Sequence, residues 1–200
     1  FAWDFGNSTT STQTNPPATF TNPGFYSVSL VVTNPNGCSD TLIQQNAIQV
    51  YDTIPPAISP ILSVSVTSNT SVEIKWMLNT AIDLQAYVLY RLDPISGNYN
   101  IIYTDTNVSN TNMALTATYT DNGLNTLAGT YTYKLLTLDR CSYAIPLDSL
   151  TAHTTINVST QTMTNNIFVS WNSYGGCPVS GYQIFRSSPF SSPQYIATVS

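Results

Sequence analysis

The chain has 200 residues, of which 42% are hydrophobic and only 8% are charged, with a formal net charge of −5 at pH 7. This length suits one to three domains, and five basic residues are too few to build the phosphate-binding patch that nucleic acid requires. The same scarcity argues against binding to anionic lipid, and no run of 18 apolar residues predicts a membrane span.

Short stretches in which apolar and polar residues alternate follow one another along the chain. The alternation is clearest at residues 26–32, 71–76, 131–135 and 166–171. A period of two places one face of each stretch against a core, as in a half-buried strand. Turn signals rich in Asn, Asp, Pro and Gly separate the stretches, and no window has the spacing of a helix. The sequence therefore predicts an all-β sandwich or barrel fold.

Two boundaries divide the chain into three expected domains, at residues 1–51, 52–158 and 159–200. The first boundary is marked by the double proline Pro55-Pro56, shortly after a strand that ends at Tyr51. Proline gives a strand ladder no N–H group and stiffens the chain, so we expect a short, semi-rigid linker there. The second boundary is softer and is expected near residues 158–162.

A weak internal repeat supports the second boundary. Trp76 ends one predicted strand and Trp171 ends another, and each is followed by a strand of the pattern Tyr-x-x-x-Arg, beginning at Tyr87 and Tyr182. The two tryptophans are 95 residues apart, and so are the two tyrosines. This spacing suits one sandwich of about 100 residues.

The first segment carries an ordered set of aromatic, glycine and proline residues. Residues 3–7 read Trp-Asp-Phe-Gly-Asn, and residues 23–28 read Pro-Gly-Phe-Tyr-Ser-Val. This order resembles the PKD (polycystic-kidney-disease-type) domain, an immunoglobulin-like sandwich, although Ser8 replaces a glycine that the family usually has. The resemblance implies a core role for Trp3. It covers residues 1–51 and lacks the first strands of the family, so we expect the natural chain to begin earlier.

The second and third segments resemble fibronectin type III domains, which are also sandwiches of the immunoglobulin-like kind. Trp76 and Trp171 match the core tryptophan of that family's second strand. Tyr131 matches its tyrosine corner, a tyrosine whose hydroxyl bonds to nearby backbone, and Tyr133 is the other candidate. The second segment has the full set of strands and the third stops after about four. The expected fold class is therefore all-β, with tandem immunoglobulin-like β-sandwiches.

The three cysteines, Cys38, Cys141 and Cys177, leave at least one without a partner in this sequence. The resemblance implies that Cys141 and Cys177 lie at the same pole of successive domains, about one strand length or roughly 25 Å apart. A disulfide needs Cα atoms within about 7 Å, so we expect these two not to pair in an extended array. Cys38 and Cys177 are each expected to form a disulfide with sequence outside this chain.

No group of residues has the pattern of a catalytic or metal site. His153 is the only histidine, lies where a last strand should begin, and is not accompanied by a Gly-x-Ser-x-Gly motif. The cysteines are too widely spaced for a zinc cluster. Asp105 and Asp121 begin short polar stretches in which calcium binding is an alternative to an ordinary turn. We expect no enzyme activity, no cofactor and no metal.

A second resemblance concerns the origin of the chain. Residues 152–156 and the later sequence Trp-Asn-Ser-Tyr-Gly-Gly at 171–176 are similar to repeats of secreted and gliding-associated surface proteins of Bacteroidetes. That resemblance implies an extracellular or cell-surface location, export by type IX secretion and a role near gliding motility. It also implies O-glycosylation of Asp-Ser/Thr-aliphatic triplets, which makes Thr41, Thr53 and Ser149 the candidate sites of a glycoprotein.

The expected function is that of a non-catalytic stalk or adhesin segment that spaces or presents a distal binding domain. Its expected partners are neighbouring domains of the same long chain, together with other surface proteins or glycans. Two alternatives stay open. The segment is an accessory region of a large secreted hydrolase, or it is a glycan-binding module, which usually needs a platform of exposed aromatic side chains.

Overall fold

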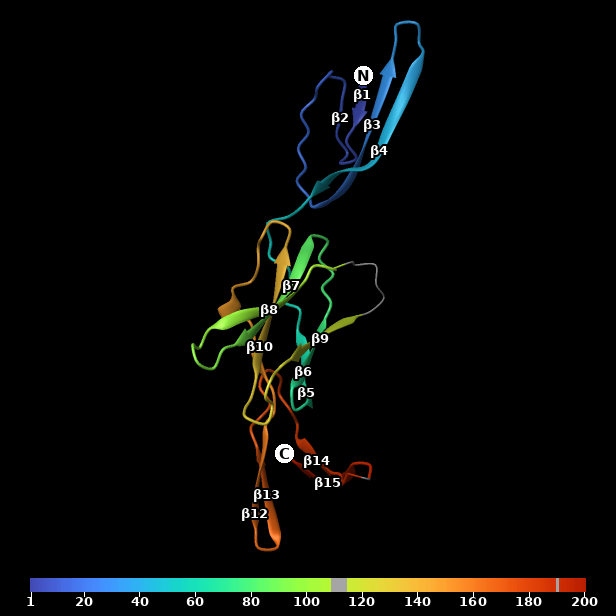
Figure 1. The fold of residues 1–200 in the computed structure, drawn as a ribbon. Coiled ribbons are helices and arrows are strands. Elements are labelled where there is room, and N and C mark those ends of the chain that lie inside the picture. The colour runs from blue at the N-terminus through green and yellow to red at the C-terminus, as the bar shows by residue number, and fades with distance from the viewer. Residues whose placement is uncertain (109–114, 190) are drawn as a thin grey trace.

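The computed structural model describes residues 1–108, 115–189 and 191–200. Its strands form five antiparallel sheets, and the described residues contain no α-helix, only the 3-10 turn η1 (Leu147–Ser149). Figure 1 shows three parts that follow one another along a long axis: a first sheet, a middle sandwich and two C-terminal hairpins. The predicted all-β fold class is confirmed.

The first sheet has four strands in the order β2-β1-β3-β4. Its members are β1 (Ala2–Asp4), β2 (Thr10–Ser11), β3 (Gly24–Thr33) and β4 (Ser39–Val50). Phe5 is the one buried hydrophobic residue of this sheet region among the described residues, and Trp3 stacks on it with ring centroids 6.2 Å apart. Trp3 itself is half-buried rather than buried as expected, because no second sheet covers this one within the described residues.

The turn after β1 requires left-handed backbone at two positions. Gly6 has a φ of +72°, and a Cβ there would lie 2.6 Å from the carbonyl oxygen of Ser27. Ser8, at the position where PKD domains usually have glycine, has a φ of +67°. A non-glycine residue in this region costs about 1–2 kcal/mol, so the left-handed backbone at Ser8 is adopted at that cost.

The middle sandwich consists of two facing sheets, in the orders β5-β6-β9 and β11-β10-β7-β8. Its strands are β5 (Ile61–Ser68), β6 (Ser71–Met77), β7 (Leu84–Leu92), β8 (Tyr99–Asp105), β9 (Thr116–Asn122), β10 (Thr132–Asp139) and β11 (His153–Thr154).

The core of the middle sandwich is built from alternating positions, as the sequence pattern predicted. In β6, Val72, Ile74 and Trp76 are fully buried while the residues between them are only half-buried. Trp76 packs on Tyr87 of the opposite sheet with ring centroids 5.9 Å apart. Since burial of one large apolar side chain contributes about 1.5–3 kcal/mol, this cluster is the main source of stability in the described chain.

The linker between the first sheet and the middle sandwich, residues 51–60, lies against the sandwich. The carbonyl oxygen of Ala57 accepts hydrogen bonds from Asn79 Nδ2 at 2.6 Å and Thr137 Oγ1 at 3.1 Å. Pro56 is buried, and the guanidinium of Arg140 lies over the ring of Tyr51, 5.9 Å from its centroid. The double-proline linker is therefore held against the middle sandwich at both Tyr51 and Ala57 rather than free.

The C-terminal hairpins are β12 (Val158–Met163) with β13 (Asn166–Trp171), and β14 (Tyr182–Arg186) with β15 (Gln194–Val199). β12 begins at Val158, so the boundary expected near residues 158–162 falls at the start of this strand, and its exact position stays a prediction. Trp171 is half-buried rather than in a closed core. It packs on Tyr182 with ring centroids 5.7 Å apart, and no third strand covers either hairpin within the described residues.

Candidate functional site

The polar side chains of the described residues form no group of three or more His, Cys, Asp or Glu placed to hold a metal ion. The same residues include no helix long and apolar enough to cross a membrane. The acidic and aromatic groups instead make fixed contacts inside the middle sandwich and between it and its neighbours.

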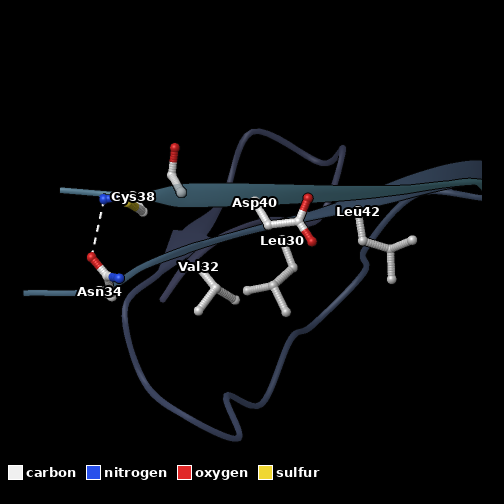
Figure 2. Close-up of a pocket in the computed structure, with 7 residues that line it drawn as sticks. Leu30, Val32, Asn34, Cys38, Asp40 and Leu42 are labelled. Atoms are coloured by element: carbon white, nitrogen blue, oxygen red, sulfur yellow. Dashed lines mark hydrogen bonds between the residues drawn. The ribbon is translucent and has the colours of Figure 1, made fainter. Parts of the chain in front are cut away.

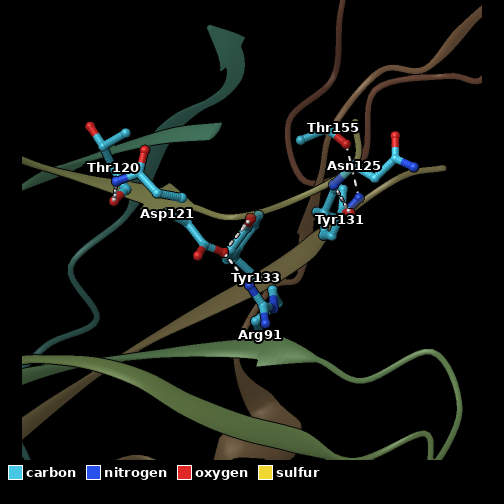
Figure 3. Close-up of polar contacts among 8 residues, drawn as sticks. Arg91, Thr120, Asp121, Asn125, Tyr131, Tyr133 and Thr155 are labelled. Atoms are coloured by element: carbon cyan, nitrogen blue, oxygen red, sulfur yellow. Dashed lines mark hydrogen bonds and ion pairs between the residues drawn. The ribbon is translucent and has the colours of Figure 1, made fainter. Parts of the chain in front are cut away.

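A partly buried ion pair joins the two sheets of the middle sandwich. Arg91 Nη1 lies 2.7 Å from Asp121 Oδ2, and the Tyr133 hydroxyl donates to the same oxygen at 2.9 Å (Figure 3). Burial, followed by the charge of Asp121, raises the pKa of Tyr133. Burial disfavours the charge of Arg91, yet its hydrogen bond to Asp121 raises its pKa overall. Asp121 therefore has a structural role, and its carboxylate is occupied by a guanidinium rather than open to calcium.

The two candidate corner tyrosines make different contacts, both drawn in Figure 3. The Tyr131 hydroxyl accepts a hydrogen bond from the backbone N–H of Asn125, six residues upstream, at 2.8 Å. The backbone of Tyr131 also pairs with Thr155, whose Oγ1 accepts its N–H at 2.9 Å. Tyr133 reaches Asp121 instead. Tyr131 thus makes the local backbone contact expected of a tyrosine corner.

His153 begins β11 and is only 4% exposed. Its Nδ1 atom lies 3.5 Å from the hydroxyl oxygen of Tyr174, in the loop between β13 and β14, and the two rings meet edge to face. Burial lowers the pKa of His153, which favours the neutral imidazole. The histidine therefore belongs to the contact between the middle sandwich and the C-terminal hairpins.

The same loop bonds to the backbone of two edge strands of the middle sandwich, β11 and β5. Gly175 pairs with Thr154 of β11 as an antiparallel bridge, with N···O distances of 3.2 and 3.4 Å. The backbone N–H of Val64, in β5, donates to the Tyr174 hydroxyl at 3.1 Å. A loop of the third segment is thereby bonded to β5, from which Tyr174 is 110 residues distant along the chain, and to β11, the last strand before the C-terminal hairpins.

Two asparagines complete this contact. Asn172 Nδ2 donates to the carbonyl oxygen of Thr155 at 3.0 Å, and Asn172 Oδ1 accepts the backbone N–H of Asn157 at 2.6 Å. The side chain of Asn157 donates in turn to the carbonyl oxygens of Thr126, at 2.8 Å, and Gly129, at 3.4 Å. Sequence reasoning noted the Trp-Asn-Ser-Tyr-Gly-Gly phrase but missed its role. The adjacent glycines were the available signal of a close backbone approach.

The first sheet carries an open apolar surface. Leu30, Val32 and Leu42 line a shallow groove on the β3–β4 hairpin (Figure 2), with Asn34 and Cys38 at one end and Asp40 between Cys38 and Leu42. Asn34 Oδ1 accepts the backbone N–H of Cys38 at 3.0 Å, which fixes the hairpin turn.

The predicted cysteine sites lie at three separate places. All three cysteines are exposed and unpaired in the part of the chain that the structure describes. The backbone N–H of Cys141 donates to Asp139 at 2.8 Å, in the loop beside the first linker, whereas Cys177 lines a small cavity with His153 at the other junction. Pairing of Cys38 and Cys177 with sequence outside the chain stays a prediction.

The candidate glycan sites are all at the surface. Thr41 is exposed on the edge strand β4, Thr53 is exposed in the linker, and Ser149 is exposed in η1. Each position leaves room for a sugar, and modification of any of them stays a prediction.

The sequence of the first sheet agrees with a known domain family. Residues 1–50 match the family model of the PKD domain. The pre-pro-metalloprotease PrtV of Vibrio cholerae serotype O1, from strains M66-2 and ATCC 39315 / El Tor Inaba N16961, is 42% identical to this chain over 57 residues. The matched stretch is 28% of this chain and 6% of the relative, so the chain spans only a small part of the curated relatives that it matches.

The predicted PKD resemblance is therefore confirmed for the first segment. PKD domains are non-catalytic, and the matched relative carries the name of a protease precursor. These findings support a non-catalytic module of a larger secreted or surface protein. The fibronectin type III and Bacteroidetes resemblances stay predictions.

Proposed function

We propose that the chain is a structural segment of a large cell-surface or secreted protein, a stalk or adhesin region that holds other domains at a distance or attaches them to a surface. The observation that carries this proposal is the direct bonding between successive parts. Residues 172–176 bond to β5 and β11, and the guanidinium of Arg140 lies over the ring of Tyr51, the last residue of the first segment. Parts joined in this way form a continuous rod rather than beads on flexible linkers.

The internal repeat supports a second fibronectin type III-like module in the third segment. The Tyr182 hydroxyl accepts the backbone N–H of Tyr174 at 2.9 Å, and the Tyr87 hydroxyl accepts the backbone N–H of Asn79 in the same way. Each donor stands three residues after its tryptophan, Trp171 or Trp76. The two segments therefore share one local architecture, and the C-terminal hairpins correspond to β5, β6, β7 and β8.

The proposed completion of the outer segments rests on their uncovered apolar faces. Val169, Trp171 and Ile184 line an open groove between the two hairpins. In the middle sandwich, the corresponding space is filled by residues from β9 and β10, including Tyr133 and Leu135. Further strands of a longer chain would close the third segment in the same way, and strands of the PKD fold would cover the face of the first sheet that carries Leu30.

The finer features of the proposal concern export and modification. A surface location, type IX secretion in a gliding bacterium of the Bacteroidetes and O-glycosylation at Thr41, Thr53 and Ser149 are proposed from sequence resemblance. Exposure of all three hydroxyls supports the last point.

An experiment on the parent protein tests the structural role. Residues 52–200 are deleted in one strain and replaced in another by an unrelated sandwich array of equal length. If the segment is a spacer, its deletion should lower surface attachment of the cells and the unrelated array should restore it. Failure of the unrelated array, with the native segment alone active, would show that these residues bind a ligand directly and would overturn the spacer proposal.

The match to a protease precursor favours one second candidate, an accessory region of a secreted hydrolase. In that case, deletion of the segment lowers hydrolysis of an insoluble polymer by the parent protein while hydrolysis of a small soluble substrate is unchanged. Loss of neither activity would exclude this role.

A further inference from the structure

We propose that residues 172–176 and residues 153–157, together with Val64, form a docking joint that holds each sandwich module on the module before it. The partner is the following module of the same chain, and the recognition chemistry is a Tyr-Gly-Gly loop laid across two edge strands. The proposal rests on the proposed function to the extent that both segments are modules of one array.

The joint spans the seam between the two sheets of the middle sandwich. β5 and β11 are edge strands of different sheets. Tyr174 bonds to β5 through the N–H of Val64, and Gly175 bonds to β11 through both of its backbone groups. Unpaired edge strands are open to pairing with other chains, so the loop both attaches the next segment and covers exposed edge backbone.

The two glycines of the loop allow an approach that side chains would prevent. A Cβ on Gly175 would lie 3.0 Å from Cβ and Oγ1 of Thr154. A Cβ on Gly176, whose φ is +112°, would lie 2.3 Å from Nδ1 of His153. The imidazole is itself 4% exposed and fixed by its strand, so it has little room to move aside. Close contact at this point therefore depends on glycine.

The loop is also fixed on the side of its own segment. The backbone N–H of Tyr174 donates to the Tyr182 hydroxyl at 2.9 Å, and the ring of Tyr182 packs on Trp171. Tyr174 thus bonds to its own segment through its backbone N–H and to β5 of the preceding segment through its hydroxyl.

The equivalent position in the middle sandwich has a related role. Asn79 stands 95 residues before Tyr174, and its backbone N–H bonds to the equivalent Tyr87 hydroxyl. Its side chain reaches back to the carbonyl oxygen of Ala57, in the linker from the preceding segment, at 2.6 Å. In both copies, the third residue after the tryptophan uses its backbone N–H to bond the tyrosine of its own segment, while its side chain bonds to an earlier strand or linker: Asn79 to the linker at Ala57 and Tyr174 to β5.

Hydrogen exchange on the full chain tests the joint at three backbone amides. The N–H groups of Val64, Asn157 and Gly175 each donate to an acceptor across the joint. We expect all three to exchange at least ten-fold more slowly than the exposed turn amides of the C-terminal hairpins. Exchange of all three at the rate of unprotected turn amides would overturn the proposal.

Two variants with matched controls make the test specific. Gly176→Ala is expected to accelerate exchange at all three amides. Gly97→Ala is the control and should leave them unchanged, because Gly97 has a φ of +71° but an added Cβ there would meet no atom within 4 Å. Tyr174→Phe removes only the hydroxyl and is expected to expose the Val64 amide. Tyr195→Phe, which loses an exposed hydroxyl in the same segment, should have no effect. Equal behaviour of variant and control in both pairs would contradict the joint.

Protection of the Ile74 amide, deep in the middle sandwich, reports separately that each variant is folded. The joint and the structural role fail in different ways. Rapid exchange of the three amides would refute the docking joint but would still allow a spacer with flexible connections between its modules. Failure of the unrelated array to restore attachment would refute the spacer proposal, whereas the protection of these amides in the native chain would not be affected.

Discussion

Replacement of Tyr133 by phenylalanine tests the polar contact inside the middle sandwich. The Tyr133 side chain is fully buried and donates to Asp121, which also holds Arg91. Phenylalanine keeps the ring and its packing, so the change removes one hydrogen bond to a carboxylate and creates no cavity. A hydrogen bond to a charged group contributes about 1.5–3 kcal/mol, and Asp121 keeps its guanidinium partner. We therefore expect a loss of about 2 kcal/mol.

Replacement of Asp121 by alanine should cost more than the loss of the Tyr133 hydroxyl. It leaves the buried Tyr133 hydroxyl without its acceptor and removes the partner of Arg91. Breaking a buried pair costs about 3–5 kcal/mol, and the side chain of Arg91 is 33% exposed, which places the expected loss at the lower end, about 3 kcal/mol. The double variant should then lose less than the sum of the single losses, since both remove the same bond.

Urea unfolding of the full chain measures these differences through the fluorescence of buried Trp76, in a background where Trp3 and Trp171 are phenylalanine. A loss of unfolding free energy below about 0.5 kcal/mol for Tyr133→Phe, the size of an ordinary surface change, would refute this prediction. Full additivity of the two losses in the double variant would also refute it. Either result would mean that the hydroxyl and the carboxylate are not coupled in the folded chain.

Three further predictions concern stability. Trp76→Ala should lower the unfolding free energy by about 3–5 kcal/mol and the half-buried Trp171→Ala by less than half as much, measured by urea titration; equal losses would contradict the assigned burial. Burial lowers the pKa of His153 in the folded chain, so the neutral imidazole stabilises the fold fully above about pH 6.5, and this stabilisation is lost as the pH falls through the lower pKa of the folded state. Urea unfolding midpoints measured from pH 8 to pH 4.5 should therefore fall in acid by a step that His153→Gln lacks. Identical pH profiles for the two proteins would contradict this prediction. Asp83 has its pKa raised mainly by burial and has an unpartnered Oδ2, so Asp83→Asn should raise the urea midpoint at pH 7 and lose that advantage in acid, whereas a lower midpoint at pH 7 would refute this.

The local elements of the fold could be predicted because they depend on local pattern. Alternation alone locates β6 and places Val72, Ile74 and Trp76 on its buried face. The burial of a tryptophan could not be predicted in the same way. Trp171 ends a strand of the same pattern as Trp76 but is half-buried, because burial depends on which other strands cover the residue.

The contact between the second and third segments could not be predicted from the sequence, since it joins residues that are distant along the chain. Val64 and Tyr174 are 110 residues apart, and neither shows in its own neighbourhood that it has a partner. Two adjacent glycines in the Trp-Asn-Ser-Tyr-Gly-Gly sequence indicated a close backbone approach, but not the imidazole of His153 as the group approached. The sequence placed His153 at the start of a strand and left its partner undetermined.

Small-angle X-ray scattering of the full chain in solution tests most directly the claim that its parts are held in line. Each of the three parts is about as long as one strand of roughly 8–12 residues, at ~3.3 Å per residue. Three such parts in line give a rod of roughly 100 Å, which corresponds to a radius of gyration of about 25–30 Å. A compact globule of the same length would have a radius of gyration of about 16 Å. A value near 25–30 Å with a pair-distance function that ends near 100 Å is predicted, and a value near 16 Å would contradict the account.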